Sequence, residues 1–403
     1  MAEVELSLSE EQLQGLLSSE RGLAVVLEAV LNRVLKGEMT DHLGAERHER
    51  TTSRRGHRNG YYERDLTLRV GTIELRVPRD REGTFRTELF ERYQRNERAL
   101  VVALMEMVVN GVSTRKVKRI TERLCGHAFS KSTVSELAAG LDVEVEAWNE
   151  RSLAGTPYPF VWVDAMGIKV RREGAVRATS ILLVTAVNAD GHREILGLRV
   201  ADSESEASWR ETFRWLQERG LAGVEIVVSD DHRGLVAALR RSFQGAVWQR
   251  CQVHFRKNVL DATPARHQAA MHRALERILD AEGQEGARMA FAEVAAELGG
   301  KADHGLEVLE SGLEDVIAVL PLPEKYRQRL RSTNPLERLI EEGRRRERVI
   351  RIFPNERSAW RLMGALFAEQ HEEWISGRRY FDMTEYVEWK AALSRDDQEK
   401  KAA

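Results

Sequence analysis

The sequence has little that a secreted or membrane-embedded protein would need. Only two cysteines, Cys125 and Cys251, occur among the 403 residues, which is too few for a disulfide framework and typical of a reducing compartment. No apolar run approaches the roughly 20 residues that span a bilayer. The first residues, MAEVELSLSEEQ, are acidic and lack the apolar core of a secretion signal. We therefore expect a cytoplasmic protein with no membrane segment.

An excess of charge of one sign is also missing. Sixty-two Lys and Arg residues against 64 Asp and Glu residues leave a net charge of -2, whereas nucleic-acid-binding domains are often strongly basic. The positive charge is local instead, with arginine dense in 47–60 and in 344–351. Such runs are also common on solvated surfaces, so their meaning depends on the rest of the chain.

Length and composition indicate a multidomain globular protein. Hydrophobic residues make up 42% of the chain and charged residues 31%, which is a globular rather than a disordered composition. A chain of this length predicts two or three domains.

The N-terminal segment, residues 1–95, combines a helix with a small sheet. Gly71 separates two alternating apolar runs, and Pro78 is expected to end the second. The expected elements are a helix over 5–38, an Arg-rich loop over 44–62, and a β-hairpin of 65–70 with 72–77.

Residues 96–154 return to helical periodicity. One helix ends at Gly111, a second begins after a Ser113 cap and ends at Gly126, and a third begins within SKSTVSEL. Three short helices with glycine turns resemble a helix-turn-helix unit, in which Lys131 would lie at a helix N-terminus that faces DNA. An ordinary helical bundle is the alternative.

From residue 155 the character changes to a mixed α/β domain. Three strand-like segments, PFVWVDAMGIKVRR, TSILLVTAVNADG and REILGLRVAD, follow one another between turn signals. The expected elements after them are a helix over 205–220, a strand over 224–231, a helix over 233–243 and a strand over 246–251. This order is that of a ribonuclease-H-like core with a mixed five-stranded sheet, and not of a doubly wound sheet, which alternates from its start.

The remaining residues are predicted to be helical. Residues 258–330 lack strand signals and are interpreted as an all-helical insertion that splits the catalytic domain into 155–257 and 331–380. The tail, 381–403, is expected to fray at its C-terminal end.

Two aspartates follow apolar strand segments. Asp164 comes after FVWV and Asp230 after VEIVVS. In the expected topology these strands are neighbours, so the two carboxylates lie side by side, which is unfavourable unless a cation sits between them. Mg²⁺ prefers such oxygen ligands. Each aspartate alone is equally explained as a turn former.

The third acidic candidate is Glu337, in STNPLERLIEEGRRR. Asn334 or Thr333 can cap this helix and Pro335 suits its first turn, which places Glu337 in the first turn of a helix expected to pack against the sheet. Alone, Glu337 would be a surface residue. Nearby acidic side chains leave the ligands open by one position or one turn: Asp231, Glu341 and Glu342.

Three converging carboxylates suit phosphodiester chemistry. Two Mg²⁺ ions, or Mn²⁺ in their place, can activate a water or a DNA 3′-hydroxyl and stabilise the leaving oxygen of an in-line displacement. The freed 3′-end can then attack a second phosphodiester.

A Cys-X-X-His pair, Cys251 and His254, follows the last short strand. A structural zinc site needs four ligands, and Cys125 is the only other thiol. The favoured interpretation is a thiol and an imidazole that support the active site, with His232 beside Asp230 as a further polar candidate. Trp248 can pack in the core or stack on a base.

These motifs resemble those of the Mutator-type transposases of bacterial insertion sequences. The resemblance runs from about Leu43 to about Trp374 and rests on several long stretches in the same order: GAERHERTTSRRGHRNGYYERDLTLRVGTIELRVPRDREGTF, VWVDAMGIKVR, VVSDDHRGL, WQRCQVHFRKN and STNPLERLIEEGRRRERVIRIFPNERSAWRL.

The resemblance implies a catalytic DDE triad of Asp164, Asp230 and Glu337 that also holds the metal, interrupted by a helical insertion. It implies an N-terminal region that binds terminal inverted repeats, a homodimer that pairs two DNA ends, and target DNA as the second substrate. A circular DNA intermediate is also implied. The family has SDGH where this chain has SDDH, and motif alignment favours Asp230 over Asp231 as the ligand.

Two other functions stay open beside an active transposase. One is a DNA-binding descendant with an inactive nuclease site, against which the presence of all three acidic residues argues. The other is a structure-selective nuclease, which would not need so long an N-terminal region. The residues expected to contact DNA are Arg54, Arg55, Arg58, Asn59, Arg115, Lys116, Lys131, Arg344, Arg345 and Arg346.

Overall fold

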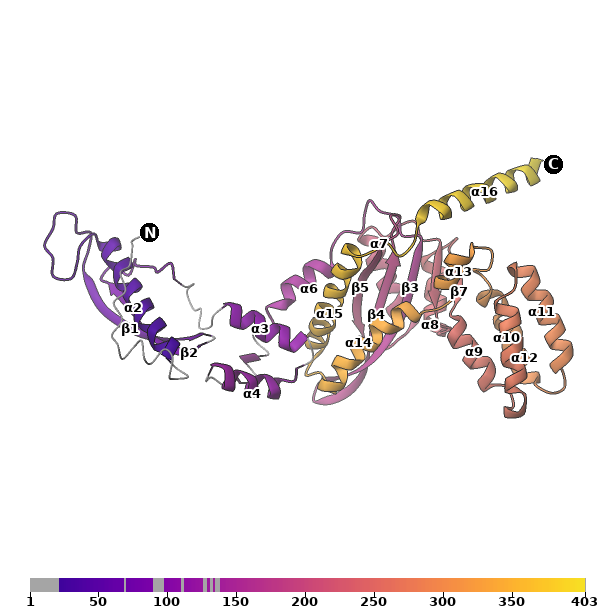
Figure 1. Ribbon diagram of the computed structural model, residues 1–403, viewed down its shortest axis with the longest axis horizontal. Helices are drawn as coiled ribbons and strands as arrows, with labels where there is room; N and C mark the ends of the chain where they lie inside the picture. The colour runs from indigo at the N-terminus through magenta and orange to yellow at the C-terminus, as the bar shows by residue number, and fades with distance from the viewer. Residues whose placement is uncertain are drawn as a thin grey trace. The chain divides into compact units, whose positions relative to one another are not determined.

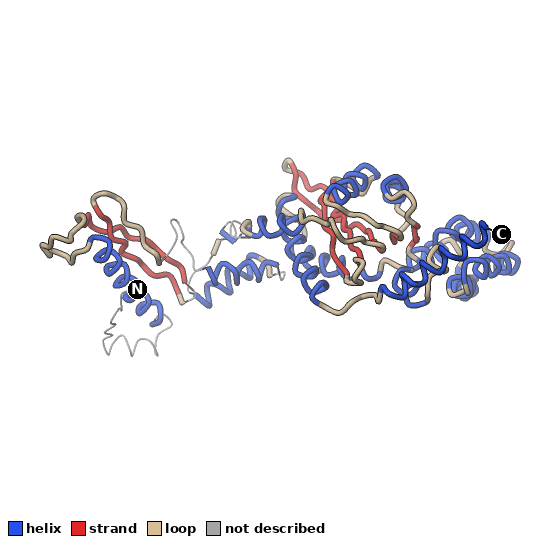
Figure 2. Tube along the Cα trace, turned by 90° about the horizontal axis from the view of Figure 1, so that it is seen from above, coloured by secondary structure: helices blue, strands red, loops and turns tan. Residues whose placement is uncertain are grey.

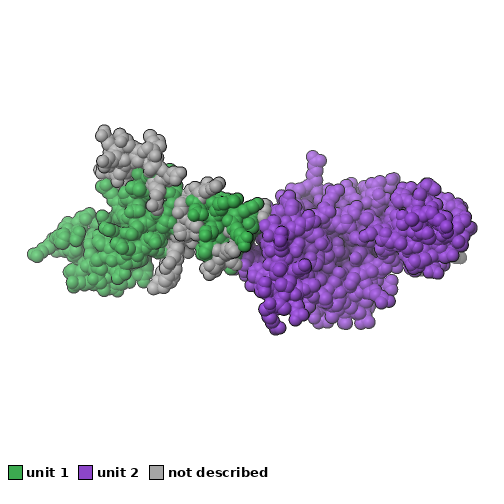
Figure 3. All heavy atoms as spheres, turned by 90° about the horizontal axis from the view of Figure 1, so that it is seen from below, with its two compact units in different colours: residues 1–140 green, residues 141–403 purple. Residues whose placement is uncertain are grey.

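The computed structural model consists of two compact units, Met1–Gly140 and Leu141–Ala403 (Figure 3). It describes residues 22–68, 70–89, 98–109, 112–125, 129–130, 133–134 and 138–402. The ends expected at Gly111 and Gly126, the helix before residue 22, and Lys131 lie outside these residues. Among the described residues, none of the helices has the length and apolar character needed to cross a membrane.

In the first unit, a long helix lies along a β-hairpin (Figure 2). The elements are α2 (Gly22–Leu43), β1 (Arg58–Leu68) and β2 (Gly71–Asp80). The strands pair antiparallel around Gly71, as expected. Residues of β2 alternate between buried and accessible, so Ile73, Leu75 and Val77 form one apolar face that packs against Leu35 and Met39 of the helix.

Two expectations for this hairpin were wrong. Pro78 does not end the second strand, which continues to Asp80 with Pro78 opposite Tyr61. A two-stranded sheet has only edge strands, so the missing N–H of proline is tolerated there. The Arg-rich loop is also shorter than expected, because β1 begins at Arg58.

Two short helices, α3 (Arg98–Val109) and α4 (Thr114–Cys125), share a small core. Leu104, Val117 and Phe129 are buried in it. The Lys116 N–H donates to Ser113 Oγ at 3.4 Å, so Ser113 caps α4 as expected. The third expected helix lies mostly outside the described residues, and only its first turn is visible, where Thr133 N–H donates to Ser130 Oγ at 3.0 Å.

The second unit is built on a five-stranded sheet with the order β5-β4-β3-β6-β7 (Figure 1). Its strands are β3 (Phe160–Arg172), β4 (Ala175–Val187), β5 (Arg193–Ala201), β6 (Ile226–Ser229) and β7 (Val247–Arg250). The first three pair antiparallel, and β6 and β7 run parallel to β3. The expected succession of three strands, helix, strand, helix, strand is therefore confirmed.

Helices cover both faces of this sheet. On one face, Val161 and Val163 pack against Trp209 of α7 (Glu206–Glu218) and Leu235 of α8 (Arg233–Ser242). Residues at even positions of β3 point the other way, where Met166 lies against Gly343 of α14. The helices on that face are α14 (Asn334–Ile350), α15 (Glu356–Ser376) and α6 (Leu141–Asn149).

Helix α6 belongs to the second unit and contacts its sheet. Asn149 binds the edge strand β5 by donating to the Leu198 carbonyl at 3.2 Å and accepting from the Leu198 N–H at 3.0 Å. The division of the chain after Gly140 consequently falls before the expected boundary at residue 154.

The residues between β7 and α14 form a helical layer with its own core. Phe255, Leu275, Val294 and Leu309 are buried in that core, in agreement with the helical character expected of 258–330. The elements are α9 (Gln252–Asp261), the 3₁₀ turn Ala265–His267, α10 (Gln268–Leu279), α11 (Gly283–Leu298), α12 (Asp303–Val316) and α13 (Glu324–Leu330).

The expectation of a frayed C-terminal tail was wrong, because Met383–Ala402 forms the helix α16. Its first turn is anchored by aromatic packing, with the Tyr386 ring centroid 4.8 Å from that of Phe160. The Tyr386 hydroxyl also donates to Glu225 at 2.9 Å. Aromatic side chains hold the first turn of this helix against the sheet.

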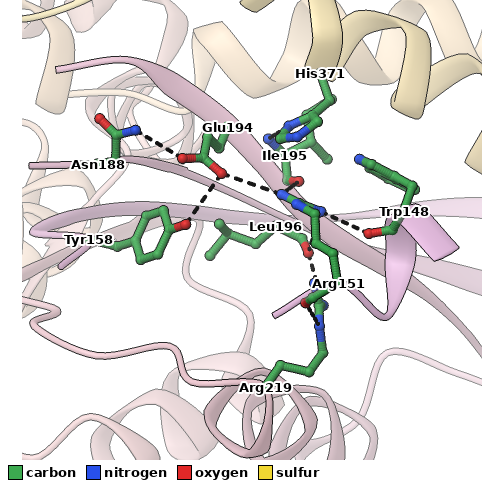
Figure 4. Close-up of polar contacts among 9 residues, drawn as sticks. All are labelled: Trp148, Arg151, Tyr158, Asn188, Glu194, Ile195, Leu196, Arg219 and His371. Carbon is green, nitrogen blue, oxygen red and sulfur yellow. Dashed lines mark hydrogen bonds and ion pairs between the residues drawn. The ribbon is translucent and has the colours of Figure 1, made fainter. Parts of the chain in front are cut away.

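Side chains occupy the outer edge of β5 near a bulge (Figure 4). Arg151 donates to the Ile195 carbonyl at 2.7 Å, and Arg219 donates to the Leu196 carbonyl at 2.9 Å. His371 Nδ1 accepts from the Ile195 N–H at 3.2 Å. These contacts satisfy backbone groups that an edge strand would otherwise offer to another chain.

Close packing of α6 on α15 makes Gly364 sensitive to substitution. A Cβ on Gly364 would overlap Cγ1 of Val145, so Gly364→Ala should lower the free energy of unfolding by about 1–3 kcal/mol. Gly286 of α11 is the matched control, since its nearest neighbour to an added Cβ is 3.7 Å away. Gly286→Ala should raise stability by about 0.5–1 kcal/mol. Urea denaturation of both variants measures the two changes in the free energy of unfolding. Equal changes in the two variants would contradict the close packing at Gly364.

Candidate active site

Asp164 and Asp230 lie on neighbouring strands. The register of β3 and β6 pairs Trp162 with Val228, and its continuation brings Asp164 level with Asp230, directly after β6. Asp164 was expected to end its strand, and this expectation is wrong. Strand β3 continues to Arg172, because β4 still pairs with it there.

The surroundings of Asp164 disfavour its charge. Burial, together with the nearby charges of Asp230 and Glu204, raises the pKa of its carboxyl to about 7. The Ala165 N–H, which donates to Oδ1 at 2.7 Å, and His254 act in the opposite direction. The carboxyl groups of Asp164 and Asp230 are therefore close enough to repel each other, as the sequence predicted.

The two adjacent aspartates after β6 have different partners. Asp231 forms an ion pair with Arg250 at 2.9 Å, which balances its charge. Oδ1 of Asp230 is buried and has no hydrogen-bond partner within the described part of the chain. Of the two, Asp230 is the residue whose charge acts on Asp164.

Glu337 lies in the first turn of α14, as predicted. Its Oε1 lies 3.1 Å from Oγ1 of Thr333 and 3.8 Å from Nε2 of His254. Thr333 precedes the helix but makes no side-chain cap, since its hydroxyl is directed to Glu337 and to Cys251. Pro335 occupies the first turn, as expected.

The other glutamates of α14 differ from Glu337 in their contacts. Glu342 pairs with Arg345 and Arg346, each at 2.6 Å, and Glu341 is exposed. Among these, Glu337 is the one in contact with His254.

Cys251 and His254 join the end of β7 to the carboxylates. The Cys251 N–H donates to the Ser229 carbonyl at 2.7 Å, and its buried Sγ lies 3.4 Å from Oγ1 of Thr333. The neighbouring Cys251 raises the pKa of His254 to about 9, against the effect of burial, with Glu337 and Asp230 adding to the shift. The imidazole is thus within electrostatic reach of all three carboxyl groups.

Glu204 is a fourth acidic side chain that sequence reasoning missed. Its Oε1 accepts from Trp209 Nε1 at 3.2 Å and lies 3.4 Å from Nδ1 of His232. Burial raises its pKa, and Asp230 adds to the shift. The sequence does place Glu204 directly before the Ser205 cap of α7 and after the third strand. That position could have indicated an acidic side chain near the site. His232, a predicted supporting residue, lies beside this glutamate.

Trp248 has a structural role at the end of the sheet. Its Nε1 donates to Ser229 Oγ at 2.9 Å, and its ring packs against the apolar core under α7 and α8. The core alternative for this residue therefore agrees with the structure.

The predicted DNA-contacting residues fall into two groups. Arg54 donates to backbone carbonyls of Glu49 and Gly56, Arg58 donates to Thr40, and Arg345 and Arg346 pair with Glu342. Arg346 is buried, which contradicts its expected role in DNA contact. The exposed residues of the set are Arg55, Asn59, Arg115, Lys116, Arg344 and Arg345, of which Arg345 pairs with Glu342.

Helix α4 carries a basic surface. Arg115, Lys116, Lys118 and Arg119 are exposed, whereas Val117 is buried against α3. The exposed positions on this helix are dominated by cations, in the unit that also contains Arg55 and Asn59.

The raised pKa of Asp164 predicts a pH-dependent stability. The folded protein retains a proton that the unfolded chain releases between pH 3.8 and about 7, so stability falls as pH rises through this window. In a metal-free buffer with chelator, Asp164→Asn should therefore gain stability over the parent protein at about pH 8 but not at about pH 4. Thermal unfolding measures the difference, with Asp261→Asn, at an exposed position of α9, as control. A gain independent of pH would contradict the shift.

Known proteins similar to this chain are transposases. A model of the family "Transposase, Mutator family" matches residues 1–377. The chain is 46% identical over 383 residues to "Transposase for insertion sequence element ISRM5" of Rhizobium meliloti (strain 1021), which covers 94% of this chain and 95% of the relative. It is 42% identical over 388 residues to "Transposase for insertion sequence element IS256 in transposon Tn4001" of Staphylococcus aureus, covering 95% of this chain and 99% of the relative.

A solved structure, "Drosophila P element transposase strand transfer complex", aligns with 72% of this chain and 94% of that chain. The TM-score of 0.37 and the identity of 9% are too low to establish a shared fold. The family match and the two bacterial relatives, each spanning nearly the whole chain, decide its membership: it belongs to the Mutator family of transposases.

Proposed function

We propose that this chain is a DNA transposase that cleaves and joins DNA strands at a DDE site of Asp164, Asp230 and Glu337. The observation that supports this most directly is the position of His254, which interacts electrostatically with all three carboxyl groups. These residues are far apart in the sequence but lie at one end of the parallel strands. A strand-transfer enzyme needs such a convergence of acidic groups.

The fold supports a ribonuclease-H-like core. The succession of three strands, helix, strand, helix and strand, expected for such a core, folds here into a mixed sheet of order β5-β4-β3-β6-β7, with three antiparallel strands followed by two parallel ones. Helices cover both faces, and the helical layer of 252–330 enters between the second aspartate and the glutamate.

The residues present fit divalent metal ions. Carboxylate oxygens are the ligands that Mg²⁺ prefers, and the buried Oδ1 of Asp230 lacks a hydrogen-bond partner among the described residues. Asp164, Asp230 and Glu337 would hold two Mg²⁺ ions, or Mn²⁺ in their place. When bound, the ions would supply activation of the attacking oxygen and stabilisation of the leaving oxygen at phosphorus.

The protein itself positions the acidic groups. Thr333 and His254 hold the Glu337 carboxylate from two sides, and the Ala165 N–H holds one oxygen of Asp164. In-line attack requires no covalent bond between protein and DNA. One site can consequently serve hydrolysis, with water as the nucleophile, and strand transfer, with a DNA 3′-hydroxyl as the nucleophile.

The first unit would bind the terminal inverted repeats. Exposed cations on α4, with Arg55 and Asn59 on the hairpin side of the same unit, can contact phosphates and position the duplex. Arg344 on α14 is exposed and would contact DNA near the catalytic carboxylates. A homodimer would pair two ends of an element before joining them to target DNA, in the cytosol where the chromosome lies.

The distinct environments of Asp230 and Asp231 favour an active enzyme over an inactive descendant. An unused carboxylate is not expected to stay buried without a partner, because such a group is costly. Family membership across residues 1–377 favours a transposase over a nuclease that only cleaves.

Removal of a catalytic carboxylate should abolish cleavage but not DNA binding. Asp230→Asn and Glu337→Gln should each reduce Mg²⁺-dependent cleavage of a duplex carrying the element's own end by about 10³-fold or more. Glu341→Gln, one turn along α14 and exposed, is the matched control and should cleave normally. Gel-shift binding of the same duplex should change little. Wild-type cleavage rates in either first variant would remove that residue from the site.

The basic surface of α4 should carry part of the affinity for DNA. Arg115→Ala combined with Lys116→Ala should weaken binding of the inverted-repeat duplex and reduce the slope of log K against log salt by about 2, because two phosphate contacts are lost. Arg273→Ala combined with Lys301→Ala removes two exposed cations from the helical layer and serves as the charge-matched control. If both double variants show the same slope of log K against log salt, the cations of α4 do not contact DNA phosphates.

A further inference from the structure

Three side chains of different chemistry meet beside the carboxylate site. Cys251 Sγ, a ring nitrogen of His254 and a carboxylate oxygen of Glu337 all lie within 4.8 Å of one another. A thiol, an imidazole and a carboxylate in such proximity differ from the oxygen ligands that Mg²⁺ selects. From this geometry we propose that Cys251, His254 and Glu337 form a separate site for a softer divalent metal ion, with Zn²⁺ as its preferred occupant.

The distances suit zinc. Tetrahedral Zn²⁺ with bonds of about 2.0–2.3 Å requires ligand atoms about 3.3–3.8 Å apart. Nε2 of His254 and Oε1 of Glu337 are 3.8 Å apart, and one ligand atom from each of the three residues lies within 4.8 Å of the other two. Rotation of these side chains by small amounts would complete the site. Three protein ligands leave the fourth position for water, as in catalytic and inhibitory zinc sites rather than structural ones.

The ligands are held by rigid local structure. Cys251 and His254 are three residues apart at the start of α9 and therefore share one face of the helix. The Cys251 N–H is bonded to Ser229 and the Gln252 N–H to Arg331, at 2.7 and 2.8 Å. The backbone N–H of Thr333 donates to Sγ at 3.5 Å, which favours the thiolate that binds metal.

An ion has a route to the buried sulfur. The side chains of His254 and Glu337 are 43% and 35% exposed, so an ion can bind them first and then reach Sγ. Binding replaces the thiol proton, which leaves to solvent. Thiolate and imidazole ligands select Zn²⁺ over Mg²⁺ by their softness, so Mg²⁺ does not compete for this set at comparable concentrations.

Occupancy of this site would inhibit strand cleavage. Glu337 cannot serve a Zn²⁺ ion held by Cys251 and the magnesium site at the same time, so Zn²⁺ would withdraw the third carboxylate. This consequence rests on the proposed function, whereas the metal site itself does not. The Cys-X-X-His pair thereby makes the enzyme responsive to available zinc.

Cobalt substitution of the full-length protein tests the site without DNA. Titration with Co²⁺ should give a thiolate-to-cobalt charge-transfer band and the visible bands of a four-coordinate ion, both saturating at one equivalent and both removed by added Zn²⁺. Cys251→Ser should lose the charge-transfer band. His254→Ala and Glu337→Gln, which alter more exposed positions, should each weaken Co²⁺ affinity by at least about 10-fold.

The other cysteine supplies the control, because Cys125→Ser should retain the band. Circular dichroism of each variant checks folding, and the two exposed-position variants keep the test valid if Cys251→Ser unfolds. Absence of a charge-transfer band in the parent protein, or its loss in Cys125→Ser but not in Cys251→Ser, overturns the proposal.

A second measurement connects the site to catalysis. Zn²⁺ added to a Mg²⁺-supported cleavage reaction should inhibit the parent protein, and Cys251→Ser should need at least about 10-fold more Zn²⁺ for the same inhibition. Equal zinc sensitivity in both proteins would overturn the inhibitory role. If the parent protein does not cleave DNA at all, the proposed function fails, and the cobalt spectrum still decides the metal site.

Discussion

Repulsion between the carboxyl groups of Asp164 and Asp230 is the constraint on which the rest of the site depends. Burial already disfavours the charge of Asp164, and a second carboxylate on the neighbouring strand disfavours it further. Such a pair weakens the fold unless protons or cations compensate. Adjacent parallel strands impose this proximity, because β3 and β6 are in register up to the residues that precede the two aspartates.

Several neighbouring groups respond to that concentration of negative charge. The imidazole of His254 lies close to both Glu337 and Cys251, and the charges of Glu337 and Asp230 help to keep it protonated. Arg250 neutralises Asp231, which leaves Asp230 as the acidic group directed to the site. Glu204, held by Trp209, adds a fourth negative group, so the site favours cations from more than one side.

The packing of α14 on the sheet and the separate core of the helical layer allow the acidic residues to come together. Helix α14 approaches the sheet closely because Gly343 has no side chain where Met166 packs, and its first turn therefore brings Glu337 to the strand ends. The helical layer between Gln252 and Leu330 has its own core, so it can separate the second and third acidic residues in sequence without disturbing the sheet.

Local sequence determined the elements and their order. Alternating and continuous apolar runs predicted the hairpin and the five strands, and the acidic residues after two of those strands predicted a cation site. Those signals are short-range, since they reflect the period of a strand or a helix. The helical tail from Met383 was not predicted, because its stability comes from the distant Phe160 and Glu225 and not from its own residues.

Only the tertiary structure decided which of several equivalent side chains do what. The residues by themselves left the choice between Asp230 and Asp231 open, motif alignment favoured Asp230, and the ion pair of Asp231 with Arg250 now distinguishes the two. The arginines predicted to contact DNA divided in the same way, since Arg346 is buried and Arg55 is exposed. Residue type sets what a side chain can bind, but contacts between residues remote in sequence set what it does bind, and no local pattern encodes those contacts.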